Sequence, residues 1–171
     1  MTILTPIPGV KALLQIKRAR ANGIVNPLYA WQESKRAGLP YELGLAFLSQ
    51  ESGGGHNVFG HDPTICVGWG EVTKAKYLSY KSKRGTFGRG GMQGVGPMQL
   101  TWYSYQDAAD KLGGCWIVNY NMRIGFSTAA YNIKRYGLHA GIAAYNGSGA
   151  AAQAYANSVL AFEASWKKKI G

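Results

Sequence analysis

The sequence predicts a mainly α-helical protein in which one long irregular segment interrupts a set of helices. Apolar residues recur at helical spacing, and Pro and Gly mark the helix ends. By contrast, the stretch from residue 52 to about 98 is rich in Gly and aromatic residues and has no sustained helical pattern. The 171 residues, 46% hydrophobic and 16% charged, suffice for a buried core. We therefore expect residues 1–171 to form a single domain.

Three helices are expected before the irregular segment, over 10–22, 26–37 and 40–51. The apolar positions that predict the first are Val10, Leu13 and Leu14. The second has the clearest ends, because Pro27 stands at its first position and Gly38 follows its last turn. The third carries apolar residues almost to its end.

The irregular segment contains one pattern typical of a small hairpin, around residues 64–73. A loop of this length inside a compact domain is usually functional. Helices resume over 101–113 with Thr101 as the N-cap, over 120–136, in a short stretch before Tyr145, and from 151 onwards. We expect a helical protein with one cleft-like insertion.

The chain is strongly basic, since 19 Lys and Arg against 8 Asp and Glu give a net charge of +11. This charge predicts attraction to nucleic acid, anionic membranes or the acidic polymers of a bacterial wall. The sequence has no zinc-finger spacing, RNP-like signature or arginine tract, which disfavours a nucleic-acid module. It also has no run of about 18 apolar residues, and residues 1–20 lack the pattern of a signal peptide. We expect a soluble protein made in a cytoplasm, without stable membrane insertion.

Motifs for cofactors and metals are missing. The glycine cluster GTFGRGGMQGVG contains neither GxGxxG nor GK[ST], and the chain has no GxSxG elbow. His56, His61 and Asp62 lie close in sequence, but without an HExxH helix they are more typical of a solvated loop. Cys66 and Cys115 are too few for a disulfide framework and form no CxxC pair. We expect two free thiols, no cofactor and no metal.

Glu51 occupies the last turn of the third expected helix, where an acidic residue is disfavoured. The negative end of the helix and partial desolvation beside an apolar run both favour the protonated carboxyl and raise its pKa. Such an acid suits the cleavage of a glycosidic bond, because the departing oxygen needs a proton. Gly53, Gly54 and Gly55 would then turn the chain away and leave room for a sugar. The alternative is a solvated helix end followed by a glycine stop.

Four short motifs follow one another in the chain: QES at 50–52, GVGPMQLT at 94–101, AAYNGSG at 143–149 and YANSV at 155–159. Over roughly residues 38–160 they resemble the ordered signatures of the lytic transglycosylase and goose-type lysozyme superfamily. The resemblance implies a lysozyme-like fold, α+β with a very small hairpin, built as a helical bundle around a substrate cleft. It also implies cleavage of the β-1,4 bond between N-acetylmuramic acid and N-acetylglucosamine in peptidoglycan, with Glu51 as the catalytic acid.

The resemblance also implies a set of substrate-binding residues. The segment around Met98 and Gln99 would form a cleft wall that holds an acetamido sugar, with Tyr145 and Asn146 beside the acid. Other interpretations remain open, because Met98 fits a core position, Gln99 a structural amide and Tyr145 simple packing. Tyr155 fits either core filling or a hydroxyl bonded to the acid. Further aromatic residues that suit sugar stacking are Trp69, Tyr77, Tyr80, Trp102 and Tyr103.

A second carboxylate would decide the reaction type. Inverting hydrolysis needs a base about 6.5 to 9.5 Å from the acid, and Glu71 and Asp62 are the candidates. The GWGE stretch that ends at Glu71 is similar to the GWGD stretch of goose-type lysozymes, although here a basic insertion separates it from the MQ motif and Thr101 stands where an Asp is often found. Hydrolysis is favoured on this basis. The alternative is attack by the muramic acid 6-hydroxyl, which leaves a 1,6-anhydro end.

The resemblance implies peptidoglycan glycan strands and the anionic wall as partners of a monomeric enzyme. Together with the missing signal peptide, it indicates a phage endolysin that is made in the host cytoplasm and reaches the wall after release, or a virion-associated or other wall-degrading domain. The basic surface would hold such an enzyme on the wall. A lysozyme-like wall-binding module without catalysis is a further alternative, which the retained Glu51 opposes.

Overall fold

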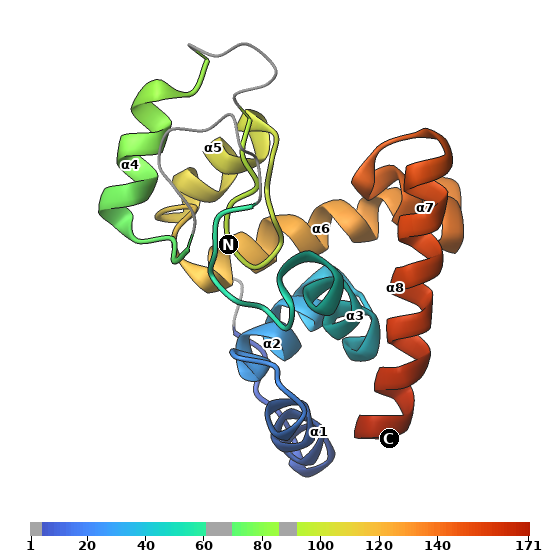
Figure 1. Ribbon diagram of the computed structural model, residues 1–171. Helices are drawn as coiled ribbons and strands as arrows, with labels where there is room; N and C mark the ends of the chain where they lie inside the picture. The colour runs from blue at the N-terminus through green and yellow to red at the C-terminus, as the bar shows by residue number, and fades with distance from the viewer. Residues whose placement is uncertain (1–4, 61–69, 86–91) are drawn as a thin grey trace.

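The computed structural model describes residues 5–60, 70–85 and 92–171, and within them eight helices account for nearly all regular structure (Figure 1). Their bounds are α1 Val10–Ala21, α2 Pro27–Ala37, α3 Tyr41–Ser52, α4 Lys74–Lys83, α5 Tyr103–Leu112, α6 Val118–Tyr136, α7 Leu138–Asn146 and α8 Gly149–Ile170. The prediction of a mainly α protein is confirmed.

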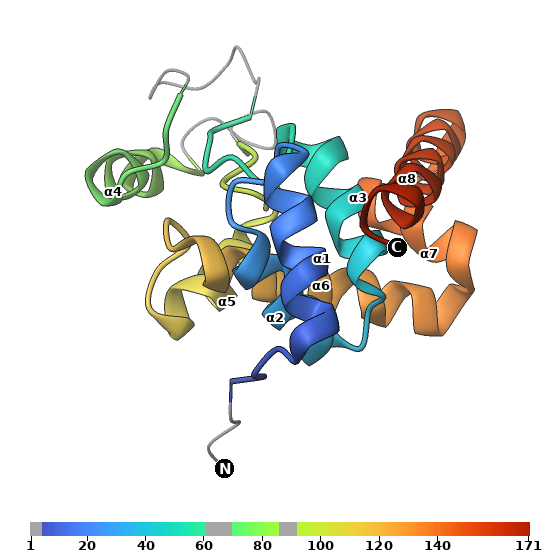
Figure 2. The same ribbon diagram turned by 90° about the horizontal axis from the view of Figure 1, so that it is seen from below.

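Helix α3 forms the centre of the fold. Every residue from Leu43 to Leu48 is buried, because α8 and α2 pack on the helix and Phe126 of α6 contacts it at Gly44. The close approach of α2 is possible because Gly44 faces Ser34, whose hydroxyl oxygen would lie 2.2 Å from a Cβ atom. Figures 1 and 2 place α4 and α5 on one side of α3 and α7 and α8 on the other.

The helices before the irregular segment form at the expected places. Pro27 begins α2, and Gly38 ends it in the left-handed conformation. In α1, however, the apolar positions that predicted the helix do not face the core: Val10, Leu13 and Leu14 are exposed, and the buried residues are Ile16 and Ala19. Helix α1 is therefore held by Ile16 and Ala19 and by the Arg18 guanidinium, which donates to the Ile170 carbonyl at the end of α8.

Helix α4 was not expected, since it lies inside the segment interpreted as irregular. Its sequence, KAKYLSYKSK, has only two buried residues, Tyr77 and Tyr80. Both rings are fully enclosed, and the Tyr77 hydroxyl donates to Asp110 at 2.9 Å. These tyrosines anchor α4 to α5, so the suggestion that they stack on sugars is wrong.

The β structure in the described residues consists of isolated bridges that pair Val58 with Glu71 and Phe59 with Val95. The first arm of the expected hairpin, residues 64–69, lies outside the described residues. The N-cap of α5 is Trp102 rather than Thr101, whose hydroxyl donates to the Gln99 carbonyl at 3.0 Å.

Two further observations concern the chain as a whole. Within residues 5–60, 70–85 and 92–171, no helix combines the length and apolar character that crossing a membrane requires. Cys115 is a free, fully buried thiol, whereas Cys66 lies outside the described residues.

Candidate active site

A pocket of about 250 Å³ lies where the ends of α3 and α7 meet the segment before α5. Four residues that the sequence indicated line it: Glu51, Gln99, Tyr145 and Asn146. The rest of its lining is Met92, Leu100, Thr101, Trp102 and Tyr105. Three of the four motifs thus meet in one place, and the fourth supplies Tyr155, which contacts the Glu51 carboxyl itself.

The chain leaves α3 immediately after Glu51 through a left-handed residue, Gly53. The N–H of Gly54 donates to the Leu48 carbonyl at 3.0 Å and so completes the helix end. The glycines turn the chain as expected, but they do not line the pocket. Gly54 instead packs on the backbone of Gly23, whose carbonyl oxygen would lie 2.5 Å from a Cβ atom.

Burial raises the pKa of the Glu51 carboxyl from its ordinary value of 4.5 to about 7. The physical cause is desolvation, which penalises the charged form at the end of a fully packed helix. The last turn of α3 has no basic residue that would stabilise the carboxylate. A carboxyl with this pKa keeps its proton at neutral pH far more often than an exposed glutamate does.

Two tyrosines bring α7 and α8 to the acid. The Tyr155 hydroxyl donates to the Glu51 carboxylate, which lowers the pKa of Glu51 and partly opposes burial. Both interpretations of Tyr155 are confirmed, because its ring is buried as well. The Tyr145 hydroxyl donates to the Met98 carbonyl at 2.8 Å, and its ring meets Phe47 edge-on at 5.3 Å between centroids. Burial raises the pKa of both tyrosines, so their hydroxyls remain donors.

The segment that forms the pocket wall is held by a buried amide that the sequence reasoning missed. Asn121 of α6 accepts from the Met98 N–H at 3.0 Å and donates to the Val95 carbonyl at 2.8 Å. Gly96 leaves the space for this side chain, since a Cβ atom would lie 2.5 Å from its amide nitrogen. The sequence did contain a signal for this role of Asn121, because it is a polar residue next to the apolar Met122 on the buried face of a helix.

Met98 itself lies in the core and not in the pocket lining, so the core interpretation of its side chain is confirmed. Its side chain fills the space that Gly125 leaves on α6. The neighbouring Leu100 is also buried, although it contributes to the pocket floor. The wall is therefore rigidly attached to α6.

Gln99 has an unusual backbone for its residue type, with φ of 45°. Its amide nitrogen donates both hydrogens to backbone carbonyls, to Val58 at 3.0 Å and to Gly96 at 2.8 Å. The side chain also packs against Gly60 and Gly94, where any Cβ atom would collide with its oxygen. The structural interpretation of this amide is supported, and only its oxygen is left to accept a hydrogen bond from a sugar.

Of the two candidates for a second carboxylate, only Glu71 lies in the described residues, and it stands apart from the pocket lining. Glu71 is exposed, pairs with Val58 in a β bridge and does not line the pocket. Asp62 and His61 lie outside the described residues. In the described ranges, no group of three or more His, Cys, Asp or Glu side chains could hold a metal ion.

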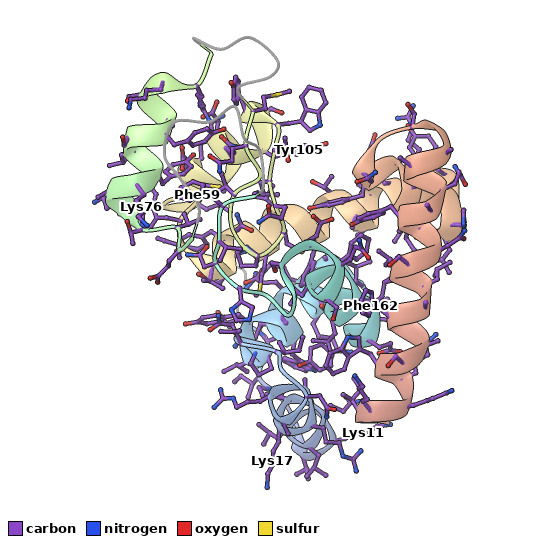
Figure 3. The ribbon with its side chains drawn as sticks, in the orientation of Figure 1. Lys11, Lys17, Phe59, Lys76, Tyr105 and Phe162 are labelled. Carbon is purple, nitrogen blue, oxygen red and sulfur yellow. The ribbon has the colours of Figure 1, made fainter. Side chains whose placement is uncertain are left out.

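Among the aromatic residues proposed for sugar stacking, Trp102 has the most suitable position. It lines the pocket and remains 55% exposed. Tyr105, which is labelled in Figure 3, lines the same pocket. Tyr103 is engaged elsewhere, because the Arg84 guanidinium covers its ring at 4.9 Å and its hydroxyl accepts from Gly85 N–H. Trp69 lies outside the described residues.

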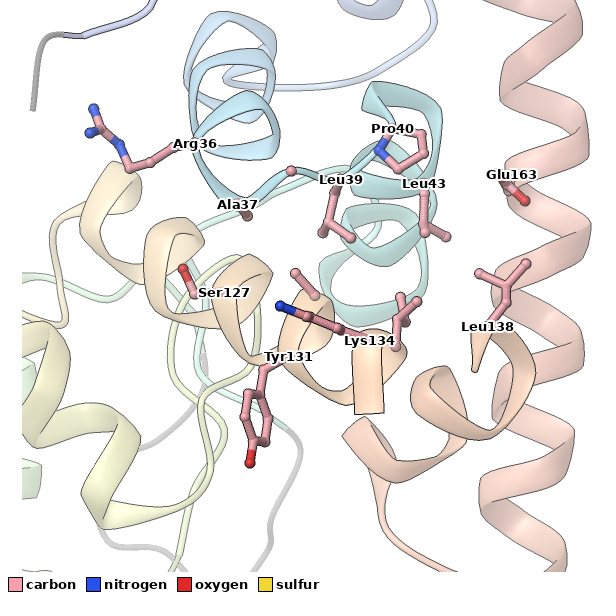
Figure 4. A pocket seen from close by; sticks show the side chains of 13 residues that line it. Arg36, Ala37, Leu39, Pro40, Leu43, Ser127, Tyr131, Lys134, Leu138 and Glu163 are labelled. Carbon is pink, nitrogen blue, oxygen red and sulfur yellow. The ribbon is translucent and has the colours of Figure 1, made fainter. Parts of the chain in front are cut away.

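A second, larger cavity of about 620 Å³ lies between the α2–α3 connection, α6, α7 and α8 (Figure 4). Its wall is largely apolar, with Leu39, Leu43 and Leu138 among the lining residues. The charged residues of its lining are Arg36, Lys134 and Glu163. The motifs identified in the sequence contribute nothing to this cavity, which separates it from the pocket at Glu51.

Comparisons of the chain with models of protein families, with curated proteins and with solved structures found no match. Membership of the lysozyme-like superfamily therefore stays a prediction that rests on the four motifs.

The raised pKa of Glu51 predicts a pH-dependent stability. The folded protein binds the Glu51 proton more tightly than the unfolded chain does. The free energy of unfolding therefore decreases as pH rises from 4.5 through 7 and this proton is lost. Glu51→Gln removes this decrease in stability, because the amide does not ionise, and its oxygen still accepts a hydrogen bond from Tyr155. We expect urea unfolding to give nearly equal stabilities near pH 4.5 and an advantage of about 3 kcal/mol for the variant at pH 8. Glu42→Gln, at the other end of α3, controls for the change in charge, and equal advantages at both pH values would contradict the assignment.

Proposed function

We propose that this protein is a muramidase that degrades peptidoglycan by cleaving the β-1,4 bond between N-acetylmuramic acid and N-acetylglucosamine. The observation that carries the proposal is the Glu51 carboxyl, whose pKa is about 7, at the wall of a pocket with polar and aromatic sides. The order of the four motifs supports the same substrate class. A wall-binding module without catalysis would have no need of a buried acid that keeps its proton.

Glu51 acts as the general acid in this proposal. Its proton passes to the glycosidic oxygen as the bond to C1 of N-acetylmuramic acid breaks, so that N-acetylglucosamine leaves as a neutral alcohol. Burial supports this step because it keeps the proton on the carboxyl at neutral pH. The Tyr155 hydroxyl then stabilises the carboxylate that remains, since it donates to the same group.

The pocket has features that suit an acetamido sugar. Asn146 and Thr101 bring groups that donate and accept, and the Gln99 oxygen adds an acceptor. The exposed face of Trp102 suits the apolar face of a pyranose ring. These residues come from both sides of Glu51, so a glycan strand that crosses the pocket contacts α7 on one side and the wall before α5 on the other.

A lytic transglycosylase is the second candidate, and the position of Glu71 favours it. Hydrolysis requires a base that takes a proton from water, and Glu71 does not line the pocket, which leaves Asp62 as the candidate. In the alternative, Glu51 gives its proton to the leaving oxygen and then takes one from the muramic acid 6-hydroxyl, which closes a 1,6-anhydro ring. No water is consumed in that reaction.

The basic composition supports attachment to the anionic wall. A monomeric enzyme with this activity fits an endolysin that is made in the host cytoplasm and acts after release, or a virion-associated enzyme. Nucleic acid is not part of the proposal.

Glu51→Gln should abolish nearly all lytic activity, because an amide cannot donate the proton. We expect turbidity of purified peptidoglycan to fall at least 10²-fold more slowly, with an unchanged circular dichroism spectrum. Glu42→Gln removes the same charge from the same helix and should retain wild-type activity. Lysis by Glu51→Gln within a few fold of wild type would contradict the proposal.

The pH profile separates an effect on the acid from general damage. Activity should be high while Glu51 is protonated and should decline above about pH 7. Tyr155→Phe removes a hydrogen bond that lowers the pKa of Glu51, so the decline should move to higher pH by about one unit. A variant that loses activity equally at every pH would show that Tyr155 serves packing alone.

Mass spectrometry of the released muropeptides assigns the reaction class. Reducing N-acetylmuramic acid ends support the hydrolase, whereas products lighter by one water support the transglycosylase. Because Glu71 does not line the pocket, we expect Glu71→Gln to keep the rate within about two-fold of wild type. A decrease in rate of about 10²-fold or more would indicate that Glu71 is the catalytic base. Asp62→Asn should slow a hydrolase by that amount and leave a transglycosylase unchanged.

A further inference from the structure

Helix α1 presents a row of aliphatic side chains at the surface. Val10 is 78% exposed, and Leu13 and Leu14 are each 52% exposed. Ile7, just before the helix, is 91% exposed. The opposite side of α1 packs on the protein through Ile16 and Ala19, so the aliphatic row faces outward.

Basic residues flank this row. Lys11, Lys17, Arg18 and Arg20 all lie on α1 and are exposed, and the helix contains no acidic residue. At a helical spacing of 100° per residue, Lys11 and Arg18 fall on one side of the row and Arg20 on the other, whereas Lys17 continues the row itself one turn after Leu13. Figure 3 shows Lys17 extending from the outer side of the helix.

Neighbouring elements add further basic and further apolar residues to this surface. The Arg18 guanidinium donates to the Ile170 carbonyl at 3.2 Å, which brings the end of α8 with Lys167, Lys168 and Lys169 beside α1. On the other side, Arg20 shares a small pocket with Leu28 and Tyr29 of α2, and both of these are partly exposed and apolar.

The acidic residues near this surface are few. Glu42 lies beside Val10 and Lys11 in a shallow cavity, and Glu163 pairs with Lys167 at 2.9 Å. The described surface around α1 is therefore strongly cationic with an aliphatic centre.

We propose that the outer face of α1 binds the surface of an anionic lipid bilayer. A helix with a central aliphatic row and cations on both sides lies in the plane of the headgroups, with its aliphatic side chains in the acyl boundary. Nucleic acids and acidic wall polymers would attract the cations but offer no apolar phase for Val10, Leu13 and Leu14. An anionic membrane complements both features, because its headgroups attract the cations and its acyl chains accept the aliphatic side chains.

This surface is separate from the proposed catalytic site. Figure 1 places α1 at the opposite end of the molecule from α5 and α7, which border the pocket. Membrane binding can therefore be tested without peptidoglycan, and its outcome does not depend on the role of Glu51.

The test uses the full chain and vesicles of equal parts phosphatidylglycerol and phosphatidylcholine, compared with pure phosphatidylcholine. We expect cosedimentation with the anionic vesicles only. The double variant Leu13→Gln, Leu14→Gln should bind at least ten-fold more weakly, because two aliphatic side chains no longer enter the lipid. Leu78→Gln, an equally exposed leucine on basic helix α4, is the matched control and should bind as wild type does.

Several outcomes would overturn the proposal. Equal binding by the double variant would mean that charge alone attracts the protein to lipid. Tighter retention on duplex DNA than on vesicles, unchanged in the double variant, would favour a polyanion site. If the wild type is a dimer and the double variant a monomer, the aliphatic row is instead a contact with a second copy of the chain. Unchanged thermal unfolding and unchanged peptidoglycan digestion by the double variant show that the fold and the pocket are intact.

Discussion

The burial of α3 on every side is the constraint on which the rest of the structure depends. Because its residues from Leu43 to Leu48 are all covered, the helix has no solvated face, and its last turn carries Glu51 into a desolvated position. The same packing places α8 against α3, which is why the Tyr155 hydroxyl reaches the carboxyl. The protonation of the acid is therefore a property of the core. An isolated helix end on the surface would leave the same carboxyl ionised.

Buried side-chain amides hold the irregular segment beside this acid. Between Val95 and Leu100 a single β bridge and a few turn hydrogen bonds satisfy only part of the backbone, and a buried polar group without a partner is costly. Asn121 supplies partners from α6, and Gln106 of α5 donates to the Leu100 carbonyl at 2.9 Å. Both amides are fully buried. The wall of the pocket is thereby fixed to two helices, as a preformed binding site requires.

Local signals in the sequence predicted the parts of the fold that local chemistry determines. Helix α2 begins at Pro27 and ends before Gly38 as expected, since Pro27 lacks an N–H and Gly38 adopts positive φ without strain. Glu51 was recognised because it opposes a local preference. The sequence failed where distant contacts decide. Helix α4 packs on α5 through two buried tyrosines, which no local pattern indicates. Periodicity alone also cannot distinguish the outward apolar face of α1 from an inward one. Likewise, nothing local indicates that the Gln99 amide is already occupied by backbone.

The enclosed thiol of Cys115 has a consequence for handling and for the environments that the protein can enter. Burial raises the pKa of this thiol to about 12, so at neutral pH it stays in the thiol form rather than the thiolate that oxidants and alkylating reagents attack. The side chain also has no exposed surface through which a second protein could form a mixed disulfide. Passage from a reducing to an oxidising compartment would leave Cys115 chemically unchanged, and its neighbours Asn121 and Tyr77 would keep their packing.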